Sequence, residues 1–287
     1  EKPEQELLWI GGNKQASATG KTFPVLNPAT GKTIAQVAEG DREDVDTACK
    51  AAAAAAEGPW GKFSSRERAR LLFRVASRVR EAKEELAQLE TKNTGKPLAD
   101  SRDEADGVAD TLEYYAGAVS KYFGETIPVG NPGLEFTLRQ PVGVCALIVP
   151  WNYPMMIAAW KLAPALACGN TVVIKPASWT PLSALRLAEL CAQAGLPDGV
   201  INMVAGSGGQ IGDPILAESD LAGIHFTGST EVFHGVWKKI GDNIQNYRTY
   251  PRLVGETGGK EFVFAHASAE AGAVAVALLR GAFEYQG

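Results

Sequence analysis

The stretch Val142–Pro176, "VGVCALIVPWNYPMMIAAWKLAPALACGNTVVIKP", decides the fold. Two runs rich in apolar residues, Val142–Val149 and Thr171–Pro176, flank a segment of helical composition that ends at Gly169. Such short apolar runs are typical of strands that are buried on both faces, as in a parallel sheet. The stretch therefore predicts a strand–helix–strand unit.

The same alternation continues towards the C-terminus. A helix is predicted from Thr180, its expected cap, through Pro181 in the first position to Gly195 at its end. Next come a strand, "GVINMVAG", the Gly-rich "GSGGQIG" with a short helix, and a further strand, "LAGIHFTGS". Alternating short strands and helices are the pattern of βαβ units. Residues 140–250 are therefore predicted to form a doubly wound parallel α/β sheet of the Rossmann-like type, which binds ligands at the carboxyl ends of its strands.

In the N-terminal part of the chain, the sequence pattern predicts short strands followed by helices. Residues 6–40 have the turn residues and short apolar runs of small strands, and residues 41–60 form a helix with acidic residues in its first turn. A second, unbroken helix is predicted from a cap at Ser64 or Ser65 to a stop at Gly95. A third covers Ala99–Phe123.

Composition excludes several classes of partner. The 287 residues are 45% hydrophobic and carry a net charge of −5, so a sizeable core is expected and neither nucleic acid nor an anionic membrane is an expected partner. No run of about 18 apolar residues predicts a membrane span, and the first residues show no secretory signal. The four cysteines have no disulfide or zinc spacing, so we expect no metal, free thiols and a reducing, cytoplasmic location.

Four predicted strand ends carry polar or glycine residues: Pro150–Asn152, Lys175–Ser178, Ala205–Gly209 and Phe226–Ser229. In an open parallel sheet these ends lie along one edge and can meet one ligand. Lys175 closes a buried strand, so its ammonium group must reach water or a ligand. The Gly-rich segment is equally compatible with a plain turn. "FTGS" fits either an anion site at a helix start or an ordinary N-cap.

Two side chains could do chemistry at this edge. The Asn152 amide could donate a hydrogen bond to a developing oxyanion, although an asparagine in a turn is the simpler interpretation. Glu256 lies in "LVGETGGK", where partial burial would raise its pKa and suit a general base. The alternative for Glu256 is a capping carboxylate.

Taken in order, the motifs resemble those of the aldehyde dehydrogenase superfamily. They run from residue 27 to residue 260 and read "NPATGK", "PWNYP", "ALACGNTVVIKPA", "AGLPDGVINMVAG", "HFTGSTEV" and "ETGGK". The resemblance implies oxidation of an aldehyde to a carboxylic acid with NAD+ or NADP+. A cysteine thiolate attacks the aldehyde, the thiohemiacetal passes hydride to the nicotinamide, and a glutamate activates the water that releases the acid.

The resemblance also implies roles for individual residues. Asn152 matches the oxyanion-hole amide and Glu256 the general base. Lys175 matches the lysine that binds the adenosine ribose, and Ser229 the residue at the pyrophosphate. Further cofactor-binding positions are Trp151 and Gly258, which match positions lining the cofactor channel, Gly206 near the adenine, and Pro150, Phe226, Thr227 and Gly228.

Ser178 stands where many NAD-preferring members of the superfamily have glutamate. A glutamate there binds both ribose hydroxyls and would repel a 2′-phosphate. Serine removes that repulsion, so the implied cofactor is NAD or NADP.

The superfamily's nucleophile is expected just beyond residue 287, because a "GQ-x-C" motif follows stretches such as "GAFEYQG", residues 281–287. None of the four cysteines occupies that place. The chain by itself is therefore expected to be inactive. Two hypotheses stay open: an aldehyde dehydrogenase, and a non-catalytic module that binds a dinucleotide and oligomerises.

The resemblance further implies two domains. Residues 1–253 would bind NAD(P) and include an oligomerisation hairpin near Thr126–Gln140, and residues 254–287 would start a second, catalytic α/β domain. The expected partners are a small aldehyde and further copies of the chain in a dimer or tetramer. "NIQNYRTYPRLVGETGGK" resembles the pyrroline-5-carboxylate (glutamate semialdehyde) dehydrogenase branch, whereas the upstream half resembles betaine-aldehyde and broad-specificity members.

Overall fold

A twisted seven-stranded sheet forms the centre of the computed structural model, which describes residues 4–285. Its strands lie in the order β12 (Arg252–Thr257), β11 (Leu221–Gly228), β8 (Val144–Ile148), β9 (Thr171–Lys175), β10 (Ile201–Met203), β2 (Leu8–Ile10) and β3 (Asn13–Gln15). The first five run parallel, and β2 and β3 are antiparallel. The predicted doubly wound parallel sheet is confirmed.

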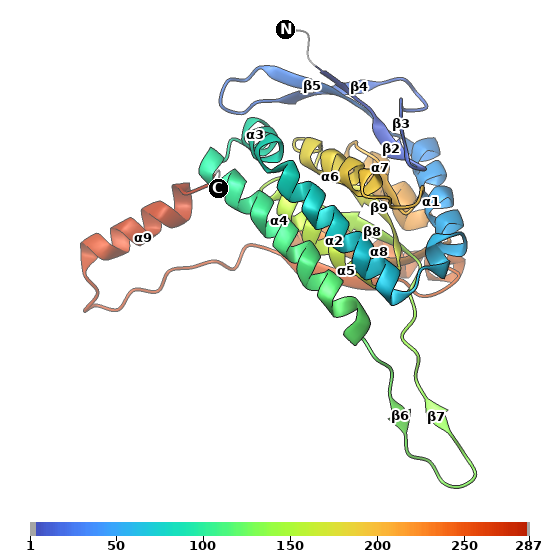
Figure 1. Cartoon of the computed structure of the whole chain (residues 1–287). Coiled ribbons are helices and arrows are strands. Elements are labelled where there is room, and N and C mark those ends of the chain that lie inside the picture. The colour runs from blue at the N-terminus through green and yellow to red at the C-terminus, as the bar shows by residue number, and fades with distance from the viewer. Residues whose placement is uncertain (1–3, 286–287) are drawn as a thin grey trace.

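Helices cover both faces of this sheet (Figure 1). Alternate strand residues point to opposite faces, so β8 sends Cys145 and Leu147 to one core and Val144 and Ala146 to the other. The first core includes α5 (Pro154–Ala167) and α6 (Leu182–Gln193), and the second includes α1 (Arg42–Glu57) and α7 (Gly208–Ala217). Next to α7 lies α8 (Thr230–Asp242).

Three helices form an outer layer over α5 and α6: α2 (Ser65–Glu81), α3 (Lys83–Thr94) and α4 (Leu98–Ala118). Ser64 caps α2 in a capping box with Glu67, and Gly95 ends α3 in the left-handed conformation, so both predicted signals are confirmed. The predicted unbroken helix is wrong, because the chain breaks at Ala82 and both α2 and α3 then pack against α4. The third helix ends at Ala118, before the predicted Phe123.

The predicted cap of α6 is also wrong. The helix begins at Leu182 with Pro181 as its N-cap, and the buried Thr180 hydroxyl has no hydrogen-bond partner among the described residues. Asn93 of α3 takes over part of the capping role, since its Oδ1 accepts from the Leu182 N–H at 3.4 Å. Its Nδ2 donates to the Trp179 carbonyl at 2.8 Å.

Two smaller sheets lie outside the centre. The strands β1 (Glu4–Glu6), β5 (Thr33–Ala38) and β4 (Thr22–Leu26) form one of them. The other is a hairpin of β6 (Thr126–Ile127) and β7 (Glu135–Phe136) that projects far from the body (Figure 1). This hairpin lies where the oligomerisation element was expected.

The remaining elements are short turns of 3-10 helix and a last α-helix. The turns cover Trp60–Lys62, Val119–Lys121 and Ile244–Asn246. After β12 the chain leaves the sheet in an extended segment and forms α9 (Ala271–Phe283), which stands apart from the body (Figure 1). Because β12 pairs with β11 from Arg252 to Thr257, a domain boundary between residues 253 and 254 would fall inside a strand.

Candidate cofactor and active site

The carboxyl ends of the parallel strands open into a cavity of about 570 Å³, which we call the strand-end cavity. Each wall comes from the last residues of one strand or the residues directly after them: β8, β9, β11 and β12. Of the predicted site residues, the structure brings together here Pro150, Trp151, Asn152, Lys175, Phe226, Thr227, Gly228, Ser229, Glu256 and Gly258. Segments that are about 100 residues apart in the sequence therefore share one cavity, as the strand-end argument predicted.

The N-terminus of α8 faces the strand-end cavity through Gly228 and Ser229. Ser229 is the N-cap of α8, and its hydroxyl accepts a hydrogen bond from the Val232 N–H at 3.3 Å. A Cβ at Gly228 would come within 2.7 Å of the Phe226 ring, so a side chain there would force that ring to move. The N-cap reading of "FTGS" is thus observed, and the same helix start presents the positive end of its dipole to the cavity.

A second cavity of about 610 Å³ lies between α7 and α8, and we call it the α7–α8 cavity. Its walls are mainly aliphatic, from Ile215, Leu216 and Val236 among others. Lys175, Phe226 and Val232 line both cavities, so the two are neighbours. The Gly-rich "GSGGQIG" is the start of α7, with Ser207 as its N-cap.

Lys175 is the last residue of β9 and is only 8% exposed. Its Nζ donates to the Pro176 carbonyl at 3.1 Å. Burial lowers the pKa of the Lys175 ammonium group. A cation that lines both cavities is well placed for a polar ligand that spans them.

Ser178 and Gly206 line neither of these two cavities. The Ser178 hydroxyl donates to the Gly206 carbonyl at 2.8 Å, so the pair joins the loops after β9 and β10. Gly206 has a φ of +156°, and a side chain there would come within 2.7 Å of Ile211. The structure therefore brings these two predicted residues to each other beside the cavities, at the same edge of the sheet.

A hydrogen-bonded chain runs from α5 to Glu256, and the sequence analysis missed its first member. Lys161 is 1% exposed, and its Nζ donates to Thr227 Oγ1 at 2.8 Å. Thr227 Oγ1 in turn donates to Glu256 Oε2 at 3.2 Å. Burial lowers the pKa of Lys161 to about 8. The sequence signal for Lys161 was that it is a single lysine in an apolar helix. A buried cation requires a polar partner, so this lysine could have been predicted to contact a polar group.

The predicted partial burial of Glu256 is wrong, because its side chain is exposed at the edge strand β12. No neighbouring strand follows β12 within the described part of the chain, so one side of Glu256 is uncovered. Its neighbour His225, on β11, is partly buried, and burial together with Lys161 lowers the pKa of His225 to about 4. His225 is therefore neutral at pH 7.

None of the four cysteines lines the strand-end cavity. Cys49, Cys145 and Cys191 are buried, and burial raises the pKa of each thiol, to about 12 for Cys145 and Cys191. Cys168 is exposed at the end of α5. Across residues 4–285 there is no cluster of metal-ligating side chains and no helix long and apolar enough to span a membrane.

Adjacent apolar and polar cavities match the two ends of an adenosine diphosphate group. An aliphatic cavity suits an adenine ring, and a helix N-terminus suits a pyrophosphate. Gly208, Gly209 and Gly212 leave open space on α7, since a side chain at any of them would meet nothing within 4 Å. The described residues therefore fit a dinucleotide.

The comparisons with known proteins agree with this fit. The sequence profile described as the aldehyde dehydrogenase family matches residues 15–287. The mitochondrial aldehyde dehydrogenase of Rattus norvegicus is 44% identical over 256 residues, which are 88% of this chain and 48% of the rat protein. Aldehyde dehydrogenase family 2 member B4 of Arabidopsis thaliana, also mitochondrial, is 49% identical over 78% of this chain and 42% of its own length.

A solved structure shows the same similarity. The NAD+ complex of an aldehyde dehydrogenase from Bacillus cereus superposes with a TM-score of 0.90 at 38% identity. The match covers 97% of this chain and 56% of the Bacillus cereus chain. This chain thus spans about half the length of the relatives that it matches.

Proposed function

Because the chain belongs to the aldehyde dehydrogenase family, we propose that it is the dinucleotide-binding part of an NAD(P)+-dependent enzyme that oxidises an aldehyde to a carboxylic acid. The observation that carries this proposal is the convergence of four strand-end loops on the strand-end cavity, beside the aliphatic α7–α8 cavity. The bound nicotinamide would accept hydride from the substrate. The nucleophilic cysteine is proposed to lie outside residues 1–287.

The chain's own residues have distinct proposed tasks. The Asn152 amide donates a hydrogen bond to the oxyanion that develops when the aldehyde is attacked. Glu256, exposed at the cavity, accepts a proton from the water that releases the acid. The hydrogen bond from Thr227, itself bound to Lys161, orients the Glu256 carboxylate.

For the cofactor, we propose that Lys175 binds the adenosine ribose and that the α8 N-terminus at Ser229 binds the pyrophosphate. Trp151 and Gly258 would line the cofactor channel, with Pro150 beside them in the same cavity. Ser178 adds no negative charge beside the ribose, which allows NADP+ as well as NAD+. NAD+ is the dinucleotide bound in the Bacillus cereus structure.

Isothermal titration calorimetry with NAD+ and with NADP+ tests the cofactor site. We expect Lys175→Met to weaken binding of both dinucleotides by about 10- to 100-fold, the usual effect of losing a hydrogen bond from a charged group.

Ser178→Glu should abolish NADP+ binding and keep NAD+ binding, because its carboxylate repels the 2′-phosphate. Lys83→Met, a change on the outer helix layer, is the control and should change neither affinity. Failure of the wild-type chain to bind either dinucleotide would refute the cofactor site.

A second candidate function is a module that binds a dinucleotide and oligomerises without turnover. It is favoured by one observation, that no cysteine of this chain lines the strand-end cavity. An activity assay of the 287-residue chain with a simple aldehyde and each dinucleotide distinguishes an active aldehyde dehydrogenase from the non-catalytic module. Formation of NAD(P)H would refute the non-catalytic module.

Assembly, location and substrate remain proposals. We propose that the β6–β7 hairpin joins copies of the chain into a dimer or tetramer. A cytoplasmic location is proposed from the free cysteines, although relatives that are named mitochondrial are among the matches. Residues 243–260 resemble the pyrroline-5-carboxylate dehydrogenase branch and the upstream half resembles betaine-aldehyde and broad-specificity members, so the two halves point to different aldehydes and no single aldehyde is proposed.

A further inference from the structure

Three ionisable side chains are buried together next to Tyr153, the residue that follows Asn152. Glu90 lies on α3, Lys96 follows the left-handed Gly95, and Glu104 lies on α4; all three are fully buried. Lys96 Nζ donates to Glu90 Oε1 at 3.2 Å and is also paired with Glu104 Oε2. A buried charge that loses its partner is strongly destabilising, so each of the three depends on the others.

Glu104 also reaches the first turn of α5. Its Oε1 accepts from the Met156 N–H at 2.9 Å, across 52 residues of sequence. The start of α5 has no cap of its own, because its N-cap Tyr153 makes no capping hydrogen bond and no acidic residue lies in its first turn. Glu104 therefore supplies from α4 the acceptor and the negative charge that a helix N-terminus favours.

Lys96 contacts the same turn. Its Nζ lies 4.2 Å from the centroid of the Tyr153 ring, a cation–π distance. Tyr153 directly follows Asn152 in the sequence, and Met156 lies one turn further on. Glu104 and Lys96 thus hold the segment that comes immediately after the loop of Trp151 and Asn152.

Glu90 shares the buried cluster and makes no hydrogen bond to α5 among residues 4–285; its charge acts on the start of α5 only through the Tyr153 hydroxyl, whose pKa it helps to raise. Its Oε2 accepts no hydrogen bond among the described residues. Ser183 of α6 lies nearby and favours the ionised form of Glu90, but the two side chains do not meet with hydrogen-bond geometry. Glu90 is therefore a matched control: it is as buried as Glu104 and has the same lysine partner.

We propose that Glu104, together with Lys96, is a positioning residue that sets where α5 begins and thereby where Trp151 and Asn152 lie at the strand-end cavity. The importance of the Asn152 amide rests on the proposed function, whereas the location of the loop does not. A displacement of about 1 Å at a group that contacts reacting atoms can cost about 100-fold in rate. A cap supplied by a distant, buried carboxylate gives such accuracy, because α5 cannot shift without breaking it.

Trp151 provides a probe of this loop that does not require turnover. Its ring lies 6.5 Å from that of Trp179, so a shift of the loop changes its surroundings. We would label the chain with 5-fluorotryptophan and record ¹⁹F NMR spectra at pH 6. Trp151→Phe and Trp60→Phe assign the two signals. Buried Trp60 donates to the Gly169 carbonyl just beyond the C-terminal end of α5, so its signal reports whether that end of the helix stays in place.

The test compares Glu104→Ala and Glu104→Gln with Glu90→Gln. Burial and the charge of Glu104 raise the pKa of Glu90 to about 7, so Glu90→Gln removes little charge at pH 6. We expect Glu104→Ala to shift the Trp151 signal strongly and Glu104→Gln to shift it less, because glutamine keeps an oxygen for the Met156 N–H. Glu90→Gln should leave the Trp151 signal in place, and the Trp60 signal should stay unchanged in all three variants.

NAD+ calorimetry on the same variants is the second readout. Glu104→Ala should weaken NAD+ binding by about three- to tenfold through loss of loop order, Glu104→Gln should restore part of it, and Glu90→Gln should have no effect. If Glu104→Ala does not fold, the comparison of Glu104→Gln with Glu90→Gln decides whether the proposal holds. The proposal is overturned if Trp151 is unchanged in the Glu104 variants, or if Glu90→Gln shifts it equally. If the wild-type chain binds no dinucleotide but Trp151 responds as expected, the proposed function fails and the positioning role stands.

Discussion

At the scale of single residues, burial controls how the charged groups of this protein ionise. Lys161 and Glu90 show the two directions: burial lowers the pKa of the lysine to about 8 and, with the charge of Glu104, raises that of the glutamate to about 7. Both shifts favour the neutral form, because a low-dielectric interior disfavours charge. The hydroxyl of Thr227 and the ammonium group of Lys96 are the partners that make these buried groups tolerable.

The raised pKa of Glu90 predicts how stability depends on pH. The folded state binds the Glu90 proton more tightly than the unfolded state, whose pKa is near 4.5. The stabilisation is complete below about pH 4.5 and is lost as the pH rises through about 7.

Urea unfolding of wild type and Glu90→Gln between pH 5 and 8 measures this loss. We expect the wild type to lose free energy of unfolding relative to the variant as the pH rises, because glutamine does not titrate. Glu218 also has a pKa of about 7, because burial and Asp46 raise it. Subtracting the free energy of unfolding of the variant from that of the wild type removes the contribution of Glu218. Parallel pH profiles for the two proteins would contradict the prediction.

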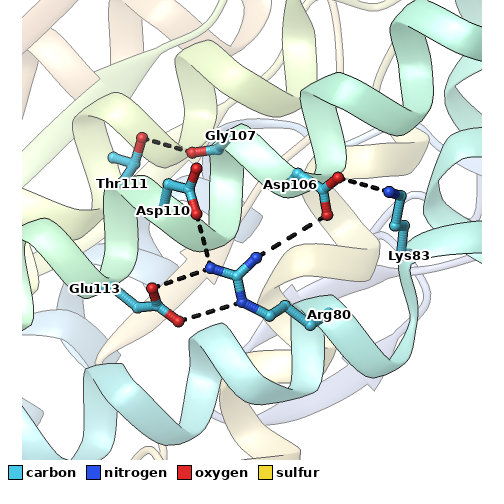
Figure 2. A network of polar contacts seen from close by, with 7 residues as sticks. All are labelled: Arg80, Lys83, Asp106, Gly107, Asp110, Thr111 and Glu113. Carbon is cyan, nitrogen blue, oxygen red and sulfur yellow. Dashed lines mark hydrogen bonds and ion pairs between the residues drawn. The ribbon is translucent and has the colours of Figure 1, made fainter.

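At the scale of elements, an exposed ionic network joins the outer helices (Figure 2). Arg80 of α2 donates to Glu113 at 3.2 and 3.0 Å and to Asp110 at 2.7 Å, both on α4. Lys83, at the start of α3, pairs with Asp106 of α4 at 2.5 Å. The break at Ala82 therefore lies between two cations that both pair with α4.

We expect Arg80→Ala to lower the free energy of unfolding by about 0.5–1 kcal/mol in low salt, the range of exposed ion pairs. Part of this difference should vanish in 1 M NaCl, because salt weakens ion pairs between exposed side chains. Arg78→Ala is the control, because among the residues that the structure describes Arg78 forms its ion pair with Glu81 of the same helix. Chemical denaturation at both salt concentrations gives the values, and a salt-independent loss would show that packing, not charge, links these helices.

At the scale of the whole molecule, the projecting hairpin exposes apolar surface. Leu134 and Leu138 are 77% and 70% exposed, and Phe136 on β7 is also exposed. A two-stranded hairpin is marginally stable in water by itself, and exposed apolar patches mark interaction surfaces. These properties support the proposed contact between copies of the chain.

Sedimentation velocity at micromolar concentration tests this assembly. The wild type should sediment as a dimer or tetramer, and Leu134→Asp with Leu138→Asp should shift it to the monomer, because each carboxylate would have to be desolvated at the contact. Trp237→Asp is the control, since Trp237 is 63% exposed on α8, outside the hairpin. An unchanged sedimentation coefficient in the double variant would place the contact elsewhere.

The sequence by itself determined the order of strands and helices, the caps at Ser64 and Gly95, and the loops that meet at the strand-end cavity. These features depend on periodicity and on hydrogen bonds between near neighbours, which a single stretch of sequence contains. Only the tertiary structure decided that Asn93 caps α6, that Glu104 caps α5 and that Lys161 reaches Thr227. Those partners are 89, 52 and 66 residues apart, so their contacts exist only after the sheet and helices have packed.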